Sequence, residues 1–153
     1  MNHHIVCGQI SFFLRIWNKE YRLGRANIAP GIIFDSENCV APDVIWISNE
    51  RLTETYQADG KLHSAPELVV EVLSPGSANE ARDRSVKLKL YSRRGVSEYW
   101  LVSWPKRQLE VYRRNPELLA LELIQTLFET DTLTSPLLPG FSCKVSEIFE
   151  KVI

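Results

Sequence analysis

The sequence predicts an α/β protein in which helices flank a central mixed β-sheet. Three observations support this fold class. Residues 3–21 repeat apolar side chains at helical spacing, residues 67–73 form a strand that is apolar on both faces, and further strands follow a second helix. Because a strand that is apolar on both faces must be covered on both sides, we expect helices above and below the sheet.

Length and composition restrict the class of protein further. The 153 residues, 44% hydrophobic and 24% charged, are typical of one folded domain, which we expect to span residues 1–153. No apolar run of about 18 residues and no secretory signal are present, so we expect no membrane span. The three cysteines, Cys7, Cys39 and Cys143, form no Cys-x-x-Cys pair, which argues against a disulfide framework or a structural zinc site and leads us to expect a cytoplasmic protein.

The first predicted element is an amphipathic helix over residues 3–21. Val6, Ile10 and Leu14 recur at the spacing of one helix face, and Gly24 ends the pattern. The short apolar run at 31–34 predicts a strand.

A second strand is predicted over residues 40–48, with Pro42 near its start, where a missing N–H is tolerated. Residues 49–66 are polar and irregular, so we expect a long connecting loop there. The apolar strand at 67–73 follows, and the Ser-Pro-Gly-Ser run at 74–77 ends it.

The remaining elements follow in the same manner. A helix is predicted over 79–94, closed by Gly95, because Gly favours the position just after a helix. Three strands are then predicted at 98–104, 108–113 and 120–127. A last short helix is expected at 146–150, with Ser146 as its N-cap.

Charge is distributed unevenly along the chain. The segment from Arg82 to Arg114 contains ten Lys and Arg residues and three acidic residues, a net charge of +7. The other residues comprise eight basic and sixteen acidic side chains, a net charge of −8, so the total is −1. Such a basic segment favours a polyanionic partner. The alternative interpretation is a solvated helix followed by a charged hairpin.

Two acidic residues lie within or next to predicted apolar strands, where a charged side chain is unfavourable. Glu71 lies inside the apolar strand, where an ionised carboxylate costs several kcal/mol unless a cation or hydrogen-bond donors compensate it. Asp43 directly precedes the apolar run Val44–Ile47. Two carboxylates on strands of one sheet that meet at a common point suit Mg²⁺ or Mn²⁺.

Lys87 is the third candidate. At about 100° per residue, Lys87 shares a helix side with Leu90 and Tyr91, whereas Lys89 points in roughly the opposite direction. A lysine that faces the sheet either extends past the core to water or neutralises an acid beneath it. Glu71 is the natural partner, although each of the three residues alone has an ordinary structural explanation.

His3 and Cys7 stand four residues apart on the first helix and could share a metal ion, but the sequence shows no further ligand for them. A terminal, solvent-exposed histidine is the alternative interpretation of His3.

Several short segments occur in a fixed order along the chain. They are Ala41–Val44, Pro66–Pro75, Lys87, Tyr91, Gly95–Val102, Leu138–Phe141 and Ile148–Phe149. This series resembles a bacterial, cyanobacteria-rich family of restriction-endonuclease-like proteins, long classed as a domain of unknown function, within the PD-(D/E)xK superfamily. The resemblance covers nearly the whole chain and implies the restriction-endonuclease-like fold.

The resemblance also implies a set of site residues. Asp43 would supply the aspartate of the motif and Glu71 the second acid, and both would bind Mg²⁺ with the main-chain carbonyl of Val72. The usual lysine position, two residues after the second acid, is occupied by Leu73. The lysine role would therefore have moved to Lys87 on the following helix.

Further expectations follow from the resemblance. His3 matches the family's histidine at the head of the first helix, and Tyr91 is a second accessory candidate. The strand pair that usually precedes this helix in the family is missing from the sequence. The basic segment, with the candidates Arg82, Arg84, Arg93 and Arg94, would bind the phosphate backbone of DNA.

The implied function is a Mg²⁺-dependent endonuclease that hydrolyses phosphodiester bonds of DNA. We expect a homodimer, since a chain of this size usually cuts both strands only when two copies act together. One alternative is a catalytically inactive module that keeps the fold and binds nucleic acid or protein. Another is a metal-dependent hydrolase of a small phosphoester.

Overall fold

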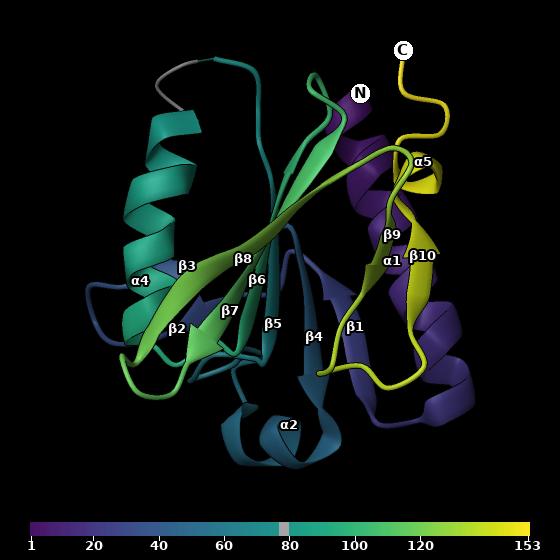
Figure 1. Ribbon diagram of the computed structural model, residues 1–153. Coiled ribbons are helices and arrows are strands. Elements are labelled where there is room, and N and C mark those ends of the chain that lie inside the picture. Colours follow the sequence, from purple (N-terminus) through teal and green to yellow (C-terminus); the bar gives the residue numbers. More distant parts are fainter. Residues whose placement is uncertain (77–79) are drawn as a thin grey trace.

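A six-stranded mixed β-sheet forms the centre of the computed structural model, which describes residues 1–76 and 80–153, without the side chain of Asp83 (Figure 1). The strand order is β1-β4-β5-β6-β7-β8, with β5 and β6 parallel and the other neighbouring pairs antiparallel. These strands are β1 (Gly24–Ile28), β4 (Val44–Ser48), β5 (Leu68–Val72), β6 (Glu98–Ser103), β7 (Gln108–Asn115) and β8 (Ala120–Phe128). The predicted mixed sheet is confirmed.

Helix α1 (Asn2–Tyr21) covers one face of the sheet and confirms the predicted first helix. Its side chains Val6, Ile10 and Leu14 are buried against even-numbered residues of the central strands, such as Val70 and Val72. The helical spacing of these apolar residues therefore marks the face that the helix buries.

The opposite face is covered by a continuous helical segment (Figure 1). A π-helical stretch η1 (Arg82–Lys87) leads into α4 (Leu88–Arg93), whose Tyr91 packs in the core beside Val69 and Leu73. This segment confirms the body of the predicted helix at 79–94. The predicted start of that helix at Asn79 and part of the predicted break at 74–77 lie outside the described residues.

Strand β5 lies between these two layers. All five of its residues are buried, with Val70 and Val72 on the α1 face and Val69 and Glu71 on the α4 face. The prediction of a strand covered on both sides is confirmed. The predicted strands at 98–104, 108–113 and 120–127 correspond to β6, β7 and β8.

Several predictions for the first half of the chain were wrong. Residues 24–28 form the edge strand β1, which was not predicted, and the expected loop at 49–66 contains helix α2 (Asn49–Thr55). The predicted strand at 31–34 is reduced to β2 (Ile32–Ile33), and the predicted strand at 40–48 is divided into β3 (Cys39–Val40) and β4. Pro42 lies in the interruption, where it cannot donate a ladder hydrogen bond.

The C-terminal segment also differs from its prediction. Strands β9 (Thr132–Thr134) and β10 (Ser142–Lys144) form a small antiparallel pair that was not predicted. Helix α5 spans Val145–Ile148, so Ser146 lies inside it and the N-cap is Lys144, without a side-chain capping bond. Packing sets this helix start, since Val145 and Ile148 are both buried in the α1-face core.

The two ends of the described chain lie close together near the upper edge of the sheet in Figure 1. The side chain of Asn2 donates to the carbonyl of Ile153 at 2.8 Å and accepts from its N–H at 3.0 Å. Within residues 1–76 and 80–153, no helix is long and apolar enough to cross a membrane.

Candidate active site

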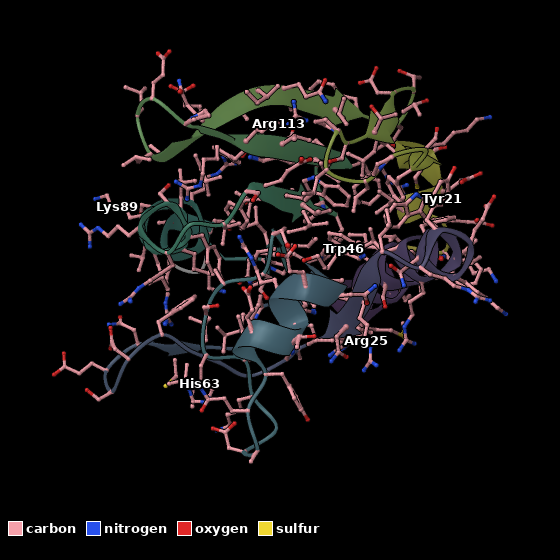
Figure 2. All side chains as sticks on the ribbon, turned by 90° about the horizontal axis from the view of Figure 1, so that it is seen from below. Tyr21, Arg25, Trp46, His63, Lys89 and Arg113 are labelled. Carbon is pink, nitrogen blue, oxygen red and sulfur yellow. The ribbon has the colours of Figure 1, made fainter. Side chains whose placement is uncertain are left out.

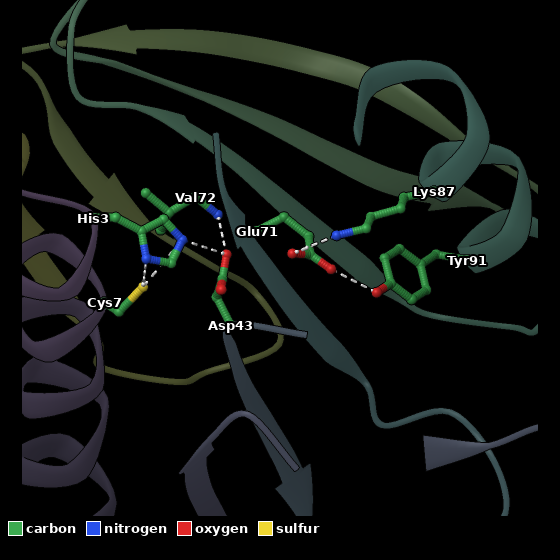
Figure 3. Close-up of polar contacts among 7 residues, drawn as sticks. All are labelled: His3, Cys7, Asp43, Glu71, Val72, Lys87 and Tyr91. Carbon is green, nitrogen blue, oxygen red and sulfur yellow. Dashed lines mark hydrogen bonds and ion pairs between the residues drawn. The ribbon is translucent and has the colours of Figure 1, made fainter. Parts of the chain in front are cut away.

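Glu71 is a buried acid on strand β5. Its side chain shares a face of β5 with Val69 and is only 3% exposed. Two groups from the covering helix compensate it: the ammonium Nζ of Lys87 lies 3.1 Å from Oε2, and the hydroxyl of Tyr91 donates to Oε1 at 2.7 Å (Figure 3). Each carboxylate oxygen thus has a partner, as a buried charge requires.

Burial nevertheless dominates the electrostatics of this carboxyl group. Desolvation is the largest influence and raises the pKa of Glu71, and the charge of Asp43 acts in the same direction, whereas Lys87 and the Tyr91 hydrogen bond lower it. The net effect is a rise of the Glu71 pKa from 4.5 to about 7. The same environment raises the pKa of the Tyr91 hydroxyl, because burial and the neighbouring carboxylate both disfavour a phenolate. Tyr91 therefore stays a hydrogen-bond donor at neutral pH.

Lys87 reaches Glu71 because of its place on the helical segment. Lys87 and Tyr91 are separated by four residues, so both face the sheet, and both contact Glu71. Lys89 instead lies on the outer side of α4 and is exposed, as Figure 2 shows. The predicted orientation of these two lysines is confirmed.

Asp43 directly precedes β4, the strand that neighbours β5. Val44 pairs with Val70 in the antiparallel β4–β5 ladder, so one further step places Asp43 opposite Glu71. The Asp43 carboxylate accepts a hydrogen bond from the main-chain N–H of Val72, with 2.7 Å between N and Oδ2. This bond fixes the acid at the end of β5.

His3 approaches Asp43 from the other side of the sheet. It lies in the first turn of α1, and its Nε2 is 3.2 Å from Oδ2 of Asp43. One helical turn later, Sγ of Cys7 lies 3.8 Å from Nδ1 of His3 (Figure 3). Burial, together with the charges of Asp43 and Glu71, raises the pKa of the Cys7 thiol to about 12.

His3, Asp43, Glu71 and Lys87 line one pocket of about 390 Å³ at this end of the sheet. Of the predicted site residues, the pocket brings together His3, Asp43, Glu71, Val72, Lys87 and Arg82. Tyr91 lies behind them, hydrogen-bonded to Glu71. The remaining lining residues were not predicted as site residues: Cys39, Val40, Ala41 and Ser74. Of these, Ala41 and Ser74 belong to segments that carry the family resemblance.

The four candidate DNA-binding arginines do not lie in equivalent positions. Arg82 lines the pocket and Arg93 is exposed on α4. Arg84 instead binds the carboxylate of Glu110 at 2.7 Å, and Arg94 forms an ion pair with Asp35. Arg84 and Arg94 are therefore engaged within the chain.

Comparisons with known proteins identify the family. A crystal structure described as "a putative nuclease belonging to DUF820 from Anabaena variabilis ATCC 29413" superposes with a TM-score of 0.73 at 15% identity, covering 97% of this chain and 80% of that one. This similarity shows a shared restriction-endonuclease-like fold. No curated protein matches the sequence. The family described as Uma2, "Putative restriction endonuclease", matches residues 1–146, and the chain therefore belongs to this restriction-endonuclease-like family.

Proposed function

We propose that this protein is a Mg²⁺-dependent endonuclease that hydrolyses phosphodiester bonds of DNA. The observation that supports this function best is the convergence of Asp43, Glu71 and Lys87 on one open pocket. Two acids and an ammonium group in this arrangement suit chemistry on a phosphate, because the acids attract a divalent cation and the ammonium attracts the anion.

The donor atoms of the pocket fit a hard cation. Restriction-endonuclease-like families generally use divalent metal ions, and Mg²⁺ prefers oxygen ligands, which the carboxylates of Asp43 and Glu71 and the main-chain carbonyl of Val72 provide. Both contacts described for Asp43 go to Oδ2, and within the described residues none joins Oδ1. When bound, Mg²⁺ would supply a water of lowered pKa and neutralise charge on the phosphate.

Lys87 takes the role that a lysine on β5 has elsewhere in the superfamily. Leu73, at that position, is 1% exposed and packs in the core beneath α4, so it contributes no charge. The Lys87 ammonium holds its place by its ion pair with Glu71 while its side chain stays 24% exposed. From there it orients the attacking water and stabilises the negative charge that develops on the phosphate.

Tyr91 and His3 act as positioning residues. Tyr91 fixes one oxygen of Glu71 through its hydrogen bond, which leaves the carboxylate little rotational freedom. His3 holds Oδ2 of Asp43 at the mouth of the pocket. Such fixed supporting contacts keep an acid pair in a productive geometry.

DNA would approach along the side of the pocket lined by Arg82 and Lys87 of η1 and continue along α4. Arg82 at the pocket and the exposed Arg93 on α4 are the proposed phosphate contacts. We further propose a homodimer, since one acid pair cleaves one strand at a time. Light scattering should then give twice the chain mass of 17.6 kDa.

Titration with Mn²⁺, followed by calorimetry and by plasmid nicking, tests the proposed function. Asp43→Asn and Glu71→Gln should each weaken Mn²⁺ binding at least tenfold and abolish nicking. Asp59→Asn is the matched control, because Asp59 also pairs with a histidine, His63 at 2.8 Å, but does not line the pocket. Nicking that survives in Asp43→Asn would overturn the proposed site.

A second candidate function is a DNA-binding module without catalysis. It is favoured by the internal contacts of the acids: both oxygens of Glu71 and Oδ2 of Asp43 already have protein partners. This function requires salt-sensitive DNA binding that does not change with Mg²⁺ and no nicking by the unmodified chain. Nicking that depends on Mg²⁺ and on Glu71 would exclude it.

A further inference from the structure

A second set of possible metal ligands lies on the α1 side of the pocket. His3, Cys7 and Asp43 each offer one ligand atom, and these three atoms lie within 4.8 Å of one another. In pairs, Nε2 of His3 is 3.2 Å from Oδ2 of Asp43 and 4.0 Å from Sγ of Cys7. Figure 3 shows the imidazole of His3 between Cys7 and the carboxylate of Asp43.

The fold assembles this set from two distant parts of the chain. His3 and Cys7 share a face of α1 because they are four residues apart, which alone gives two ligands. Asp43 joins them because the β4–β5 register and the N–H of Val72 place its carboxylate in front of the first turn of α1. The third ligand is thus visible only in the folded chain.

The separations match a small tetrahedral ion. Typical Zn–S, Zn–N and Zn–O bonds of about 2.3, 2.0 and 2.1 Å, at tetrahedral angles, put the ligand atoms about 3.4 to 3.6 Å apart. The observed 3.2 and 4.0 Å bracket this spacing. The third pair of ligand atoms, from Cys7 and Asp43, lies within 4.8 Å, so side-chain rotations are needed to bring all three atoms to bonding distance. The adjoining pocket offers room for a fourth ligand such as water.

We propose that His3, Cys7 and Asp43 form a binding site for a thiophilic divalent transition-metal ion, of which Zn²⁺ is the model. A thiolate and an imidazole favour Zn²⁺ or Co²⁺ over Mg²⁺, which prefers oxygen alone. Cys7 is 5% exposed, whereas the side chains of His3 and Asp43 are 27% and 22% exposed, so the ion enters from the pocket side. Binding releases the Cys7 proton to solvent, because the thiolate is the ligand.

This site and the proposed Mg²⁺ site share Asp43. Occupation by Zn²⁺ directs the carboxylate of Asp43 toward α1 and places a second positive charge beside Glu71. The two ions therefore exclude each other, and Zn²⁺ acts as an inhibitor of the nuclease. This regulatory consequence rests on the proposed function, whereas Zn²⁺ binding itself does not.

Co²⁺ absorption spectroscopy tests the site independently of activity, because a Co²⁺–thiolate bond gives a charge-transfer band in the near ultraviolet. All proteins should carry Cys39→Ser, which removes the exposed thiol. We expect one equivalent of Co²⁺ to produce the band, Cys7→Ser to abolish it, and His3→Ala to weaken binding at least tenfold.

Matched controls separate specific from incidental effects. Cys143→Ser should leave the band unchanged. It removes a buried thiol whose pKa is likewise about 12, but among the contacts described, Sγ of Cys143 contacts only the carbonyl of Lys144. His4→Ala removes an exposed histidine next to His3 and should also have no effect. A band that persists in Cys7→Ser, or an affinity that is unchanged in His3→Ala, overturns the proposal.

Inhibition is measured on the same proteins. Zn²⁺ should suppress Mg²⁺-dependent plasmid nicking, and Cys7→Ser should raise the Zn²⁺ concentration needed at least tenfold while leaving nicking without Zn²⁺ intact. Equal inhibition of both proteins overturns the regulatory part. If no nicking occurs at all, the proposed function fails, and the Co²⁺ spectra still decide whether the metal site exists.

Discussion

The ammonium of Lys87 lies 3.1 Å from the carboxylate of Glu71, although the two residues come from different layers of the fold. Glu71 projects from a strand whose five residues are all buried, and Lys87 reaches down to it from the end of the π-helical stretch η1. A strand lysine at position 73 would lie on the same face of the sheet as Glu71. The helical segment that covers this face thus supplies, through Lys87, the positive charge that the strand lacks because residue 73 is leucine.

This pairing makes Lys87 the most informative position for activity. If the proposed function holds, we expect Lys87→Ala to reduce Mg²⁺-dependent plasmid nicking by about 100-fold or more, because the substitution removes the charge proposed to stabilise the developing phosphate anion. Lys89→Ala is the matched control, since Lys89 is exposed on the outer side of the same helical segment. Equal rates for the Lys87→Ala protein and the unmodified chain would refute the role given to Lys87.

Glu71 should make the protein less stable as the pH rises. Its pKa is about 7 in the folded chain against 4.5 as a free side chain, so between these values the folded state holds more protons than the unfolded state. The free energy of unfolding therefore falls from pH 4.5 to 7, by up to about 3 kcal/mol from this group. Above pH 7 Glu71 is ionised in the folded state, and the full cost of burying its charge lowers the free energy of unfolding.

Urea unfolding at pH 5 and pH 8, without divalent ions, measures this effect. In Glu71→Gln the contribution should vanish, so the variant gains stability relative to the unmodified protein at pH 8 but not at pH 5. An equal difference between the two proteins at both pH values would show that Glu71 does not titrate in this window.

The arginines of the basic segment should divide into two groups. Arg82→Ala and Arg93→Ala should weaken DNA binding for all sequences and reduce the slope of log affinity against log salt by about 1 each. Arg84→Ala should instead cost about 1–2 kcal/mol of stability, because it leaves the carboxylate of Glu110, 10% exposed, without its cation. Fluorescence anisotropy at several salt concentrations and urea unfolding provide the two measurements. A salt slope unchanged by either of the first two substitutions would exclude that residue as a phosphate contact.

Two glycines should respond in opposite ways to alanine. Gly24 lies in β1, where an added Cβ would come 2.1 Å from the carbonyl oxygen of Ile47, so Gly24→Ala should destabilise the protein by more than about 2 kcal/mol. Gly8 lies in α1 with nothing within 4 Å of its Cβ position, so Gly8→Ala should add about 0.5–1 kcal/mol. Thermal unfolding of both variants gives the comparison. A lower melting temperature for Gly8→Ala would contradict the open space described at that position.

The elements that the sequence predicts are those that bury large apolar residues at a regular spacing. Helix α1 and strands β5 and β6 have this property. Strand β1 lacks it, because its buried positions are the small residues Gly24 and Ala26. At Gly24, a side chain would collide with the carbonyl oxygen of Ile47 and the ring of Trp46. Helix α2 buries only Thr55. Its N-terminus is capped by the side chain of Ser48, which accepts a hydrogen bond from the N–H of Arg51.

The candidate site divides along similar lines. Glu71 is visible in the sequence because a charge interrupts an apolar strand, and helical spacing points Lys87 toward it. The contact between His3 and Asp43 is not visible, because it depends on how α1 lies across the end of the sheet. The internal ion pairs of Arg84 and Arg94 cannot be predicted by counting charges along the sequence, because their partners lie on other strands and loops.

The parallel pairing of β5 with β6 has a consequence for how the candidate site is assembled during folding. Two parallel neighbours need a crossover connection, and here that connection includes η1 and α4, which bear Lys87 and Tyr91. The chain therefore cannot complete its sheet without passing this helical segment over Glu71. Joining of the two halves of the sheet and assembly of the acid–ammonium pair are one folding event, so recovery of nicking should coincide with recovery of the native fold during refolding.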